Sequence, residues 1–280
     1  MDATLTTDDG LALHVHHWPA TAPARGSIVL VHGLGEHVMR YRHVAEHLNR
    51  AGWHVVGHDH RGHGRSGGAR GALRHGDDLL RDLAPVIDAA RARGPGPLLL
   101  LGHSLGGQIA ARFAAEGAAA TPAPWFRPLD AVVLSSPALD PGMNPFQKAL
   151  LAVAGPLAPD LAVHNGLKPA WISRDPQVVQ AYAADPLVHS RVTPKLVRFL
   201  LDAAALVQRR APQWSVPTLL MWAGSDRCVA PRGSAAFAAA APRERVAAHE
   251  FPALFHEIFN EPEQREVFDV LDTWLATLKS

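Results

Sequence analysis

Short apolar runs alternate with longer amphipathic segments along most of the chain. The short runs are rich in leucine and β-branched residues and cover positions 4–7, 11–18, 27–31, 53–57, 98–101, 131–134, 218–223 and 246–251. The longer segments have helical character and cover positions 40–51, 79–93, 108–116, 233–241 and 262–279. The run 98–101 consists of four leucines, which is too short for a helix and is typical of a strand buried on both faces. The alternation predicts an α/β fold in which helices cover both faces of a mostly parallel sheet.

The amino-terminal end departs from this order. Two strand-like runs, 4–7 and 11–18, flank the turn sequence Asp8-Asp9-Gly10. An Asp-Gly turn between two apolar runs predicts an antiparallel hairpin at this edge of the sheet.

A second departure is the segment 140–212. It contains frequent prolines, no strand-like run and two stretches of helical appearance, at 149–153 and 196–206. An insertion of about seventy residues is far longer than the usual connection of about 2–6 residues in an α/β unit. We therefore expect a helical cap, or lid, at 140–212, above a core that is built from 1–139 and 213–280.

Composition and charge narrow the class of protein. The chain of 280 residues has 27 lysines and arginines against 26 acidic residues, a formal net charge of +1. This balance gives no reason to expect a nucleic-acid partner. Four arginines fall close together and are expected in a solvated loop; they are Arg61, Arg65, Arg70 and Arg74.

The expected compartment follows from cysteine usage and apolar runs. The single cysteine, Cys228, rules out an intrachain disulfide. The first ten residues are polar, unlike a secretory signal, and no apolar run reaches the roughly 18 residues of a membrane-spanning helix. We expect a cytoplasmic protein, with loose contact to a membrane left open.

The candidate nucleophile is Ser104. It lies in a G-x-S-x-G pattern at 102–106, directly between the leucine run and a helical segment. A nucleophile elbow needs this context, because the serine is carried on a tight strand-to-helix turn and the glycines relieve its steric contacts. The start of the following helix also directs amide N–H groups toward developing negative charge.

An oxyanion needs preorganised donors. One donor is expected from the residue after the nucleophile, as the backbone N–H of Leu105. The second is expected from the loop after the first parallel strand, His32-Gly33-Leu34-Gly35-Glu36-His37. Two glycines let this loop bend toward the site, which makes the backbone N–H of Leu34 the candidate.

The serine also needs a base, and the base needs an orienting acid. In a site of this kind both follow the serine in chain order, on loops beyond later strands. Asp226 follows the run 218–223, and His256 follows the run 246–251. Asp140, which opens the insertion, is the rival for the acid.

Several weaker signals carry alternatives. His14 and His16 alternate along one strand, but two ligands are too few for a metal site, so neither a metal nor a cofactor is expected. His60 and His63 lie in a glycine-rich loop and either brace the site or are solvated. Cys228 is expected to be a small buried apolar side chain, although it could also face the pocket.

These motifs together resemble the monoacylglycerol lipase and lysophospholipase-like family of α/β-hydrolases. The resemblance covers nearly the whole chain and rests on the motifs at 32–37 with Arg40 and Tyr41, at 59–66, 102–107 and 135–139, at 224–226 with Val229 and Pro231, and at 255–257 with Asn260 and Glu261. It implies the α/β-hydrolase fold, the triad Ser104, Asp226 and His256, the oxyanion donors Leu34 and Leu105, and a cap over an acyl tunnel.

The expected activity is hydrolysis of a carboxylic ester with an apolar acyl chain, most consistent with a monoacylglycerol or lysophospholipid, through an acyl-enzyme. Thioesterase, peptidase and carbon–carbon hydrolase activities use the same residues and stay open. The alternative from another class is a non-catalytic ligand receptor on a hydrolase fold. The expected partner is a small-molecule acyl ester, with transient contact between the cap and a membrane or micelle surface. The oligomeric state is left open.

Overall fold

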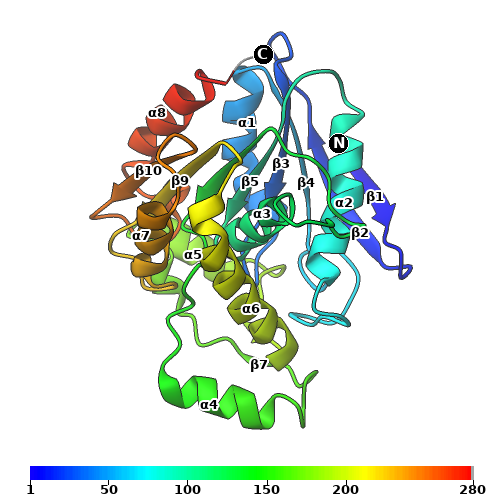
Figure 1. The fold of residues 1–280 in the computed structure, drawn as a ribbon, viewed down its shortest axis with the longest axis vertical. Helices are drawn as coiled ribbons and strands as arrows, with labels where there is room; N and C mark the ends of the chain where they lie inside the picture. Colours follow the sequence, from blue (N-terminus) through cyan, green and yellow to red (C-terminus); the bar gives the residue numbers. More distant parts are fainter. Residues whose placement is uncertain (279–280) are drawn as a thin grey trace.

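A computed structural model describes residues 1–278, apart from the side chains at positions 148, 150 and 154. Its centre is a sheet of eight strands in the order β1-β2-β4-β3-β5-β6-β9-β10 (Figure 1). The strands are β1 (Asp2–Thr6), β2 (Ala12–Trp18), β3 (Gly26–Val31), β4 (Trp53–His58), β5 (Leu98–His103), β6 (Ala131–Ser135), β9 (Thr218–Ala223) and β10 (Val246–Phe251). Within this sheet only the pairs β1–β2 and β2–β4 are antiparallel, so the predicted α/β architecture with a mostly parallel sheet is confirmed.

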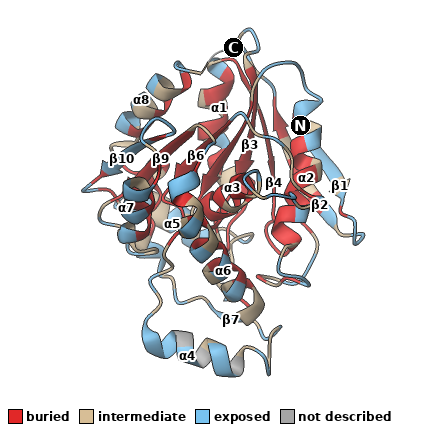
Figure 2. Ribbon diagram, viewed as in Figure 1, coloured by how far each residue is buried: buried red, intermediate tan, exposed pale blue. Residues whose placement is uncertain are grey.

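Side chains of the central strand β5 alternate between two apolar cores, one on each face of the sheet. Leu98 and Leu100 belong to the core shared with α2, α3 and α7. Leu99 and Leu101 belong to the core shared with α1 and α8. The inner strands are buried in Figure 2, as expected for a sheet covered on both faces, whereas the edge strands β1 and β10 are largely exposed. The helices are α1 (Arg42–Arg50), α2 (Asp78–Arg91), α3 (Leu105–Glu116), α7 (Pro231–Ala240) and α8 (Gln264–Leu275).

The predicted hairpin is present at the edge of the sheet. Strands β1 and β2 pair across a turn in which the Gly10 N–H donates to the Thr7 carbonyl at 2.9 Å. Gly10 has a φ of +81°, a conformation that glycine adopts without steric cost. The final helix α8 ends at Leu275, earlier than position 279, which lies outside the described residues.

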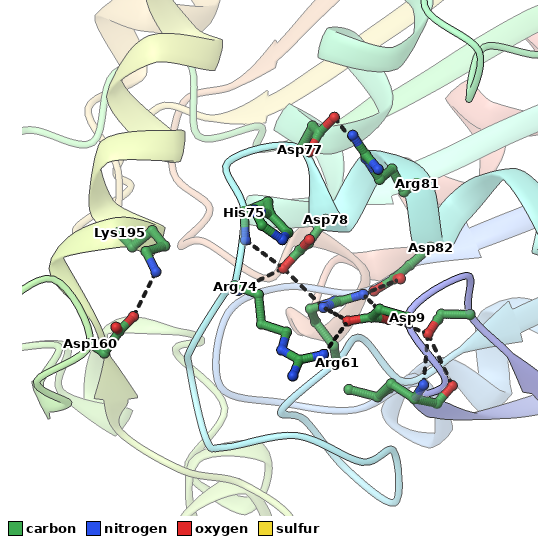
Figure 3. Close-up of polar contacts among 12 residues, drawn as sticks. Asp9, Arg61, Arg74, His75, Asp77, Asp78, Arg81, Asp82, Asp160 and Lys195 are labelled. Atoms are coloured by element: carbon green, nitrogen blue, oxygen red, sulfur yellow. Dashed lines mark hydrogen bonds and ion pairs between the residues drawn. The ribbon is translucent and has the colours of Figure 1, made fainter.

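The expectation that the arginines of the loop between β4 and α2 are all solvated is wrong for one of them. Arg65 and Arg74 are exposed, but Arg61 is only 4% exposed. Its guanidinium donates to Asp82 at 2.6 and 2.7 Å, to Asp78 at 2.9 Å and to Asp9 at 3.2 Å (Figure 3). Arg61 therefore ties the hairpin turn to the start of α2, which a loop sequence alone does not reveal.

The segment 140–212 is more structured than expected. Its elements are α4 (Pro145–Ala154), β7 (Val163–His164), the 3₁₀ turn η2 (Pro169–Trp171), α5 (Pro176–Ala184), β8 (Arg191–Val192) and α6 (Pro194–Arg210). The two expected helices are present and longer than predicted. Helix α5 was not expected, although its start carries an N-cap aspartate followed by proline. The strands β7 and β8 contradict the expected absence of strands, because two-residue strands leave no periodic signal.

Helices α4 and α6 have different surroundings. Phe199, Leu200 and Val207 of α6 are buried in the same apolar core as α3. Helix α4 lies beyond α6 at the bottom of Figure 1, away from the sheet, and much of its surface is exposed in Figure 2. Among residues 1–278, no helix is both long enough and apolar enough to cross a bilayer.

Candidate active site

Ser104 lies on a strained turn between β5 and α3. Its φ of +55° and ψ of −119° are rare for a residue with a side chain. Neighbouring glycines make this turn possible. A Cβ on Gly106 would lie 2.0 Å from the Val31 carbonyl oxygen, and one on Gly102 would lie 2.3 Å from the Gly106 carbonyl oxygen. The strand–serine–helix context that the sequence predicts is therefore present.

Asp226 and His256 lie side by side, although 30 positions separate them in the chain. They follow β9 and β10, which are neighbouring parallel strands, so their carboxyl ends meet at one edge. The Asp226 Oδ2 atom is 2.6 Å from the His256 Nδ1 atom. The Asp226 Oδ1 atom accepts the backbone N–H groups of Cys228 and Val229 at 2.7 and 3.0 Å. Because an ionised carboxylate accepts the Nδ1 proton, this contact leaves Nε2 as the basic nitrogen of the neutral ring.

The electrostatics of this pair favour the charged forms of both groups. Burial raises the pKa of Asp226, but His256 and the two backbone donors lower it overall. Burial lowers the pKa of His256, but the Asp226 carboxylate and its hydrogen bond raise it above the ordinary value. An imidazolium that forms at His256 is thus stabilised, which fits the general base expected at this position.

The loop after β3 lies against the candidate nucleophile Ser104. A Cβ on Gly33 would be 3.3 Å from the Ser104 Cβ atom, and Gly35 has a φ of +77°. Leu105 is the first residue of α3, so its backbone N–H has no acceptor within that helix. Within residues 1–278, the backbone N–H of Leu34 donates to no protein acceptor. Two unpaired donors on segments that flank Ser104 are what an oxyanion hole needs.

Two cavities meet at Ser104. One, called the polar cavity below, has a volume of about 230 Å³ and a mixed wall, in which His256, Glu257 and Lys168 lie among apolar side chains and which is richer in polar groups than the wall of the other cavity. The other has a volume of about 470 Å³ and a mainly apolar wall that includes Val197 and Leu200. The residues that border both cavities are Leu34, Ser104, His164, Asn165, Leu167 and Cys228. A substrate that reacts at Ser104 can therefore place an apolar part on one side and a polar part on the other.

The alternative candidates for the orienting acid and for a metal site lie elsewhere or have other partners. The Asp140 carboxylate binds the Arg232 guanidinium at 2.7 Å. His16 binds Asp2 at 2.5 Å on the edge strand. Among the described residues, the group whose side chains could share a metal ion is Asp226, Cys228 and His256, which belongs to the site itself.

The burial of His60, His63 and Cys228 differs from the simplest expectation, which was two solvated histidines and a buried cysteine. His60 and His63 are buried rather than solvated, and the His60 Nε2 atom is 2.8 Å from the His32 carbonyl oxygen. Cys228 is only partly buried and borders both cavities.

Sequence reasoning assigned no role to a buried charged group beside His256. Glu36, Arg40 and Glu257 form this group, and Glu36 and Glu257 line the polar cavity. In the sequence these residues stood out only because they belong to two motifs, at 32–37 with Arg40 and at 255–257, which lie far apart in the chain. Nothing in either motif indicates that the two segments are in contact.

The fold and this site define a serine hydrolase with the α/β-hydrolase fold. The family model "Serine aminopeptidase, S33" matches residues 22–263, and the chain belongs to this family. The chain is 38% identical to a monoacylglycerol lipase of Mycolicibacterium smegmatis over 93% of this chain and 91% of that protein. It is 32% identical to phospholipase YtpA of Bacillus subtilis over 90% and 95% of the two chains. The crystal structure of Paleococcus ferrophilus monoacylglycerol lipase matches with a TM-score of 0.83 at 34% identity, covering 95% of this chain and 98% of that one.

Proposed function

We propose that this enzyme hydrolyses carboxylic esters that combine a long apolar acyl chain with a small polar alcohol, as in monoacylglycerols or lysophospholipids. The observation that carries the proposal is the position of Ser104 at the junction of an apolar and a polar cavity. The acyl chain enters the larger apolar cavity, and the alcohol lies in the polar one. Similarity to a monoacylglycerol lipase and to a phospholipase supports the same substrate class.

The chemistry follows the residues at this junction. The Ser104 Oγ atom attacks the ester carbonyl carbon while its proton passes to the His256 Nε2 atom. The Leu34 and Leu105 N–H groups stabilise the oxyanion, and Asp226 stabilises the imidazolium. The imidazolium returns the proton to the alkoxide as the alcohol leaves. A water molecule then releases the fatty acid from Ser104 by the same proton transfers in reverse order.

The segment 140–212 acts as the cap in this proposal and contacts a lipid surface. Large apolar side chains are exposed along α4 and the residues that follow it; they are Phe146, Val153, Leu157 and Leu161, with exposed fractions of 61–83%. Leu161 also borders the apolar cavity. Exposed apolar patches of this kind mark binding surfaces, and a lipid surface is where such substrates reside.

Labelling with a fluorophosphonate tests the nucleophile. We expect covalent labelling of the wild-type enzyme and none of Ser104→Ala, together with a loss of at least about 10⁴-fold in kcat. Ser215→Ala is the control, because Ser215 is exposed on the loop before β9. Labelling or near-normal turnover in Ser104→Ala would refute the assignment. An intact wild-type fold that neither labels nor hydrolyses esters would favour the non-catalytic receptor.

The head group is tested with substrates that share one acyl chain. Hydrolysis of a monoacylglycerol, a lysophosphatidylcholine and an acyl-thioester is compared by kcat/KM. We expect the two oxygen esters to be preferred over the thioester. Preference for the thioester would move the assignment to a thioesterase.

A further inference from the structure

We propose that Glu36, Arg40 and Glu257 form a buried clamp that joins the oxyanion loop to the loop carrying His256, and that its carboxylates stabilise the imidazolium. These three are positioning residues, because none of them is assigned contact with the reacting atoms. The inference rests on the proposed function.

The clamp spans two segments that lie 217 positions apart. The Arg40 Nη1 and Nη2 atoms donate to the Glu257 carboxylate at 2.7 and 2.8 Å, a bidentate contact. The Arg40 Nη1 atom also donates to the Glu36 Oε2 atom. The three side chains are between 2% and 10% exposed. The Tyr182 ring of α5 lies 4.6 Å from the Arg40 guanidinium.

Glu36 connects the clamp to the oxyanion loop. Its Oε1 atom accepts the Gly33 N–H at 2.6 Å, immediately before the proposed donor Leu34. The Tyr41 hydroxyl donates to the same oxygen. Burial and the neighbouring Glu257 carboxylate raise the pKa of Glu36 above its ordinary value. Arg40, Tyr41 and Gly33 nevertheless all donate to this carboxylate, and this geometry suits its ionised, acceptor-only form. The conformation of the oxyanion loop therefore depends on Glu36.

Glu257 connects the clamp to the general base. It directly follows His256, and its Oε2 atom also accepts the Asn260 side-chain N–H at 2.8 Å. Its backbone N–H donates to the Ile172 carbonyl oxygen at 2.8 Å. Burial raises the pKa of Glu257, but Arg40 outweighs burial and lowers it to about 2, so Glu257 is ionised at neutral pH.

The charge of the clamp favours a protonated His256. Two carboxylates share one guanidinium, which leaves one negative charge on the clamp. The other groups facing His256 are Asp226, Cys228 and His103, whose ring centroid is 4.6 Å from that of His256. Burial lowers the pKa of His103 to about 3, so it stays neutral. Glu257 and Glu36 therefore add to the stabilisation of the imidazolium by Asp226.

A contribution to folding stability does not by itself explain why these three charged side chains are buried together. A buried ion pair or triad contributes little net free energy of folding compared with apolar side chains of the same volume. A role in holding the two loops in register, and in setting the charge beside the base, explains why the chain buries three charged groups there.

Glu257→Gln tests the charge of the clamp, because it keeps the shape of the side chain. We expect the acid limb of the kcat/KM–pH profile to move down by about one pH unit. We expect kcat at the plateau to fall about tenfold, with KM little changed. Glu266→Gln is the control, since Glu266 is an exposed carboxylate on α8. An acid limb and kcat that match wild type in folded Glu257→Gln would overturn the role of the charge.

Arg40→Lys tests the geometry, because it keeps the charge and loses the bidentate contact. We expect kcat and the affinity for an alkylboronic acid, a tetrahedral analogue, to fall by about tenfold each. The acid limb should stay near that of wild type. Wild-type boronate affinity in a folded Arg40→Lys protein would overturn the link to the oxyanion loop. Failure of the proposed function is distinguishable, because it would appear in the wild-type enzyme itself, as loss of fluorophosphonate labelling or as preference for the thioester, and not as a difference between wild type and the clamp variants.

Discussion

Narrowing the apolar cavity should shorten the acyl chain that the enzyme prefers. Val197 borders this cavity from α6, and Val197→Trp extends an aromatic ring into it. If a methylene group needs roughly the 30 Å³ that a water molecule occupies in the liquid, the cavity of about 470 Å³ holds an acyl chain of up to about fifteen carbons.

The expected increase in kcat/KM per acyl carbon follows from the free energy of transferring a methylene group from water into the apolar cavity. Each buried methylene contributes about 0.8 kcal/mol, so kcat/KM rises by up to about fourfold per carbon if the full free energy reaches the transition state. The rise should continue until the cavity is full. In Val197→Trp the rise should stop several carbons earlier, while the rate on acetate esters stays unchanged, because Ser104 and the oxyanion donors are not altered.

The assay is kcat/KM for p-nitrophenyl esters with acyl chains from C2 to C16. Ala205→Trp serves as the matched control, because Ala205 is an exposed position on the same helix. The reasoning fails if the wild-type profile peaks at C2 and falls steadily, which is the behaviour of a small-ester hydrolase. It also fails if Val197→Trp and Ala205→Trp give the same chain-length profile.

Three further predictions concern the acid, the base and the buried arginine. Asp226→Asn should lower kcat by about 10⁴-fold by favouring the wrong tautomer of His256, whereas Asp140→Asn should remain close to wild type; reversed results would show that the acid is misassigned. In a pH profile, kcat/KM should rise as His256 loses its proton, with a midpoint above the ordinary histidine value of 6.5 because its pKa is raised; a midpoint below that value would contradict the assigned electrostatics. In urea unfolding, Arg61→Met should lower the free energy of unfolding by about 3–5 kcal/mol, because it leaves buried carboxylates unpaired; the exposed Arg74→Met should change it by less than about 0.5 kcal/mol, and equal effects would count against the role of Arg61.

Much of the fold follows from local pattern. Strands β9 and β10 begin and end where the apolar runs do, and β5 extends two residues beyond its four leucines. Buried parallel strands such as β5 and β9 are short and mostly apolar, so their sequence differs from that of the surrounding helices. The chain order of serine, acid and base then selected Asp226 and His256 among many carboxylates and 17 histidines. The structure brings these two side chains into hydrogen-bond contact.

Other features were decided only by tertiary contacts. The sequence placed Arg61 in a polar loop, but carboxylates from the hairpin turn and from α2 surround it once the chain folds. The contact between Arg40 and Glu257 joins residues 217 positions apart, and no periodicity or spacing reports such a pairing. Helical and strand periods reflect which side of a local segment is buried. The partners of a buried charge, and the two cavities that meet at Ser104, depend instead on which distant segments the fold packs together.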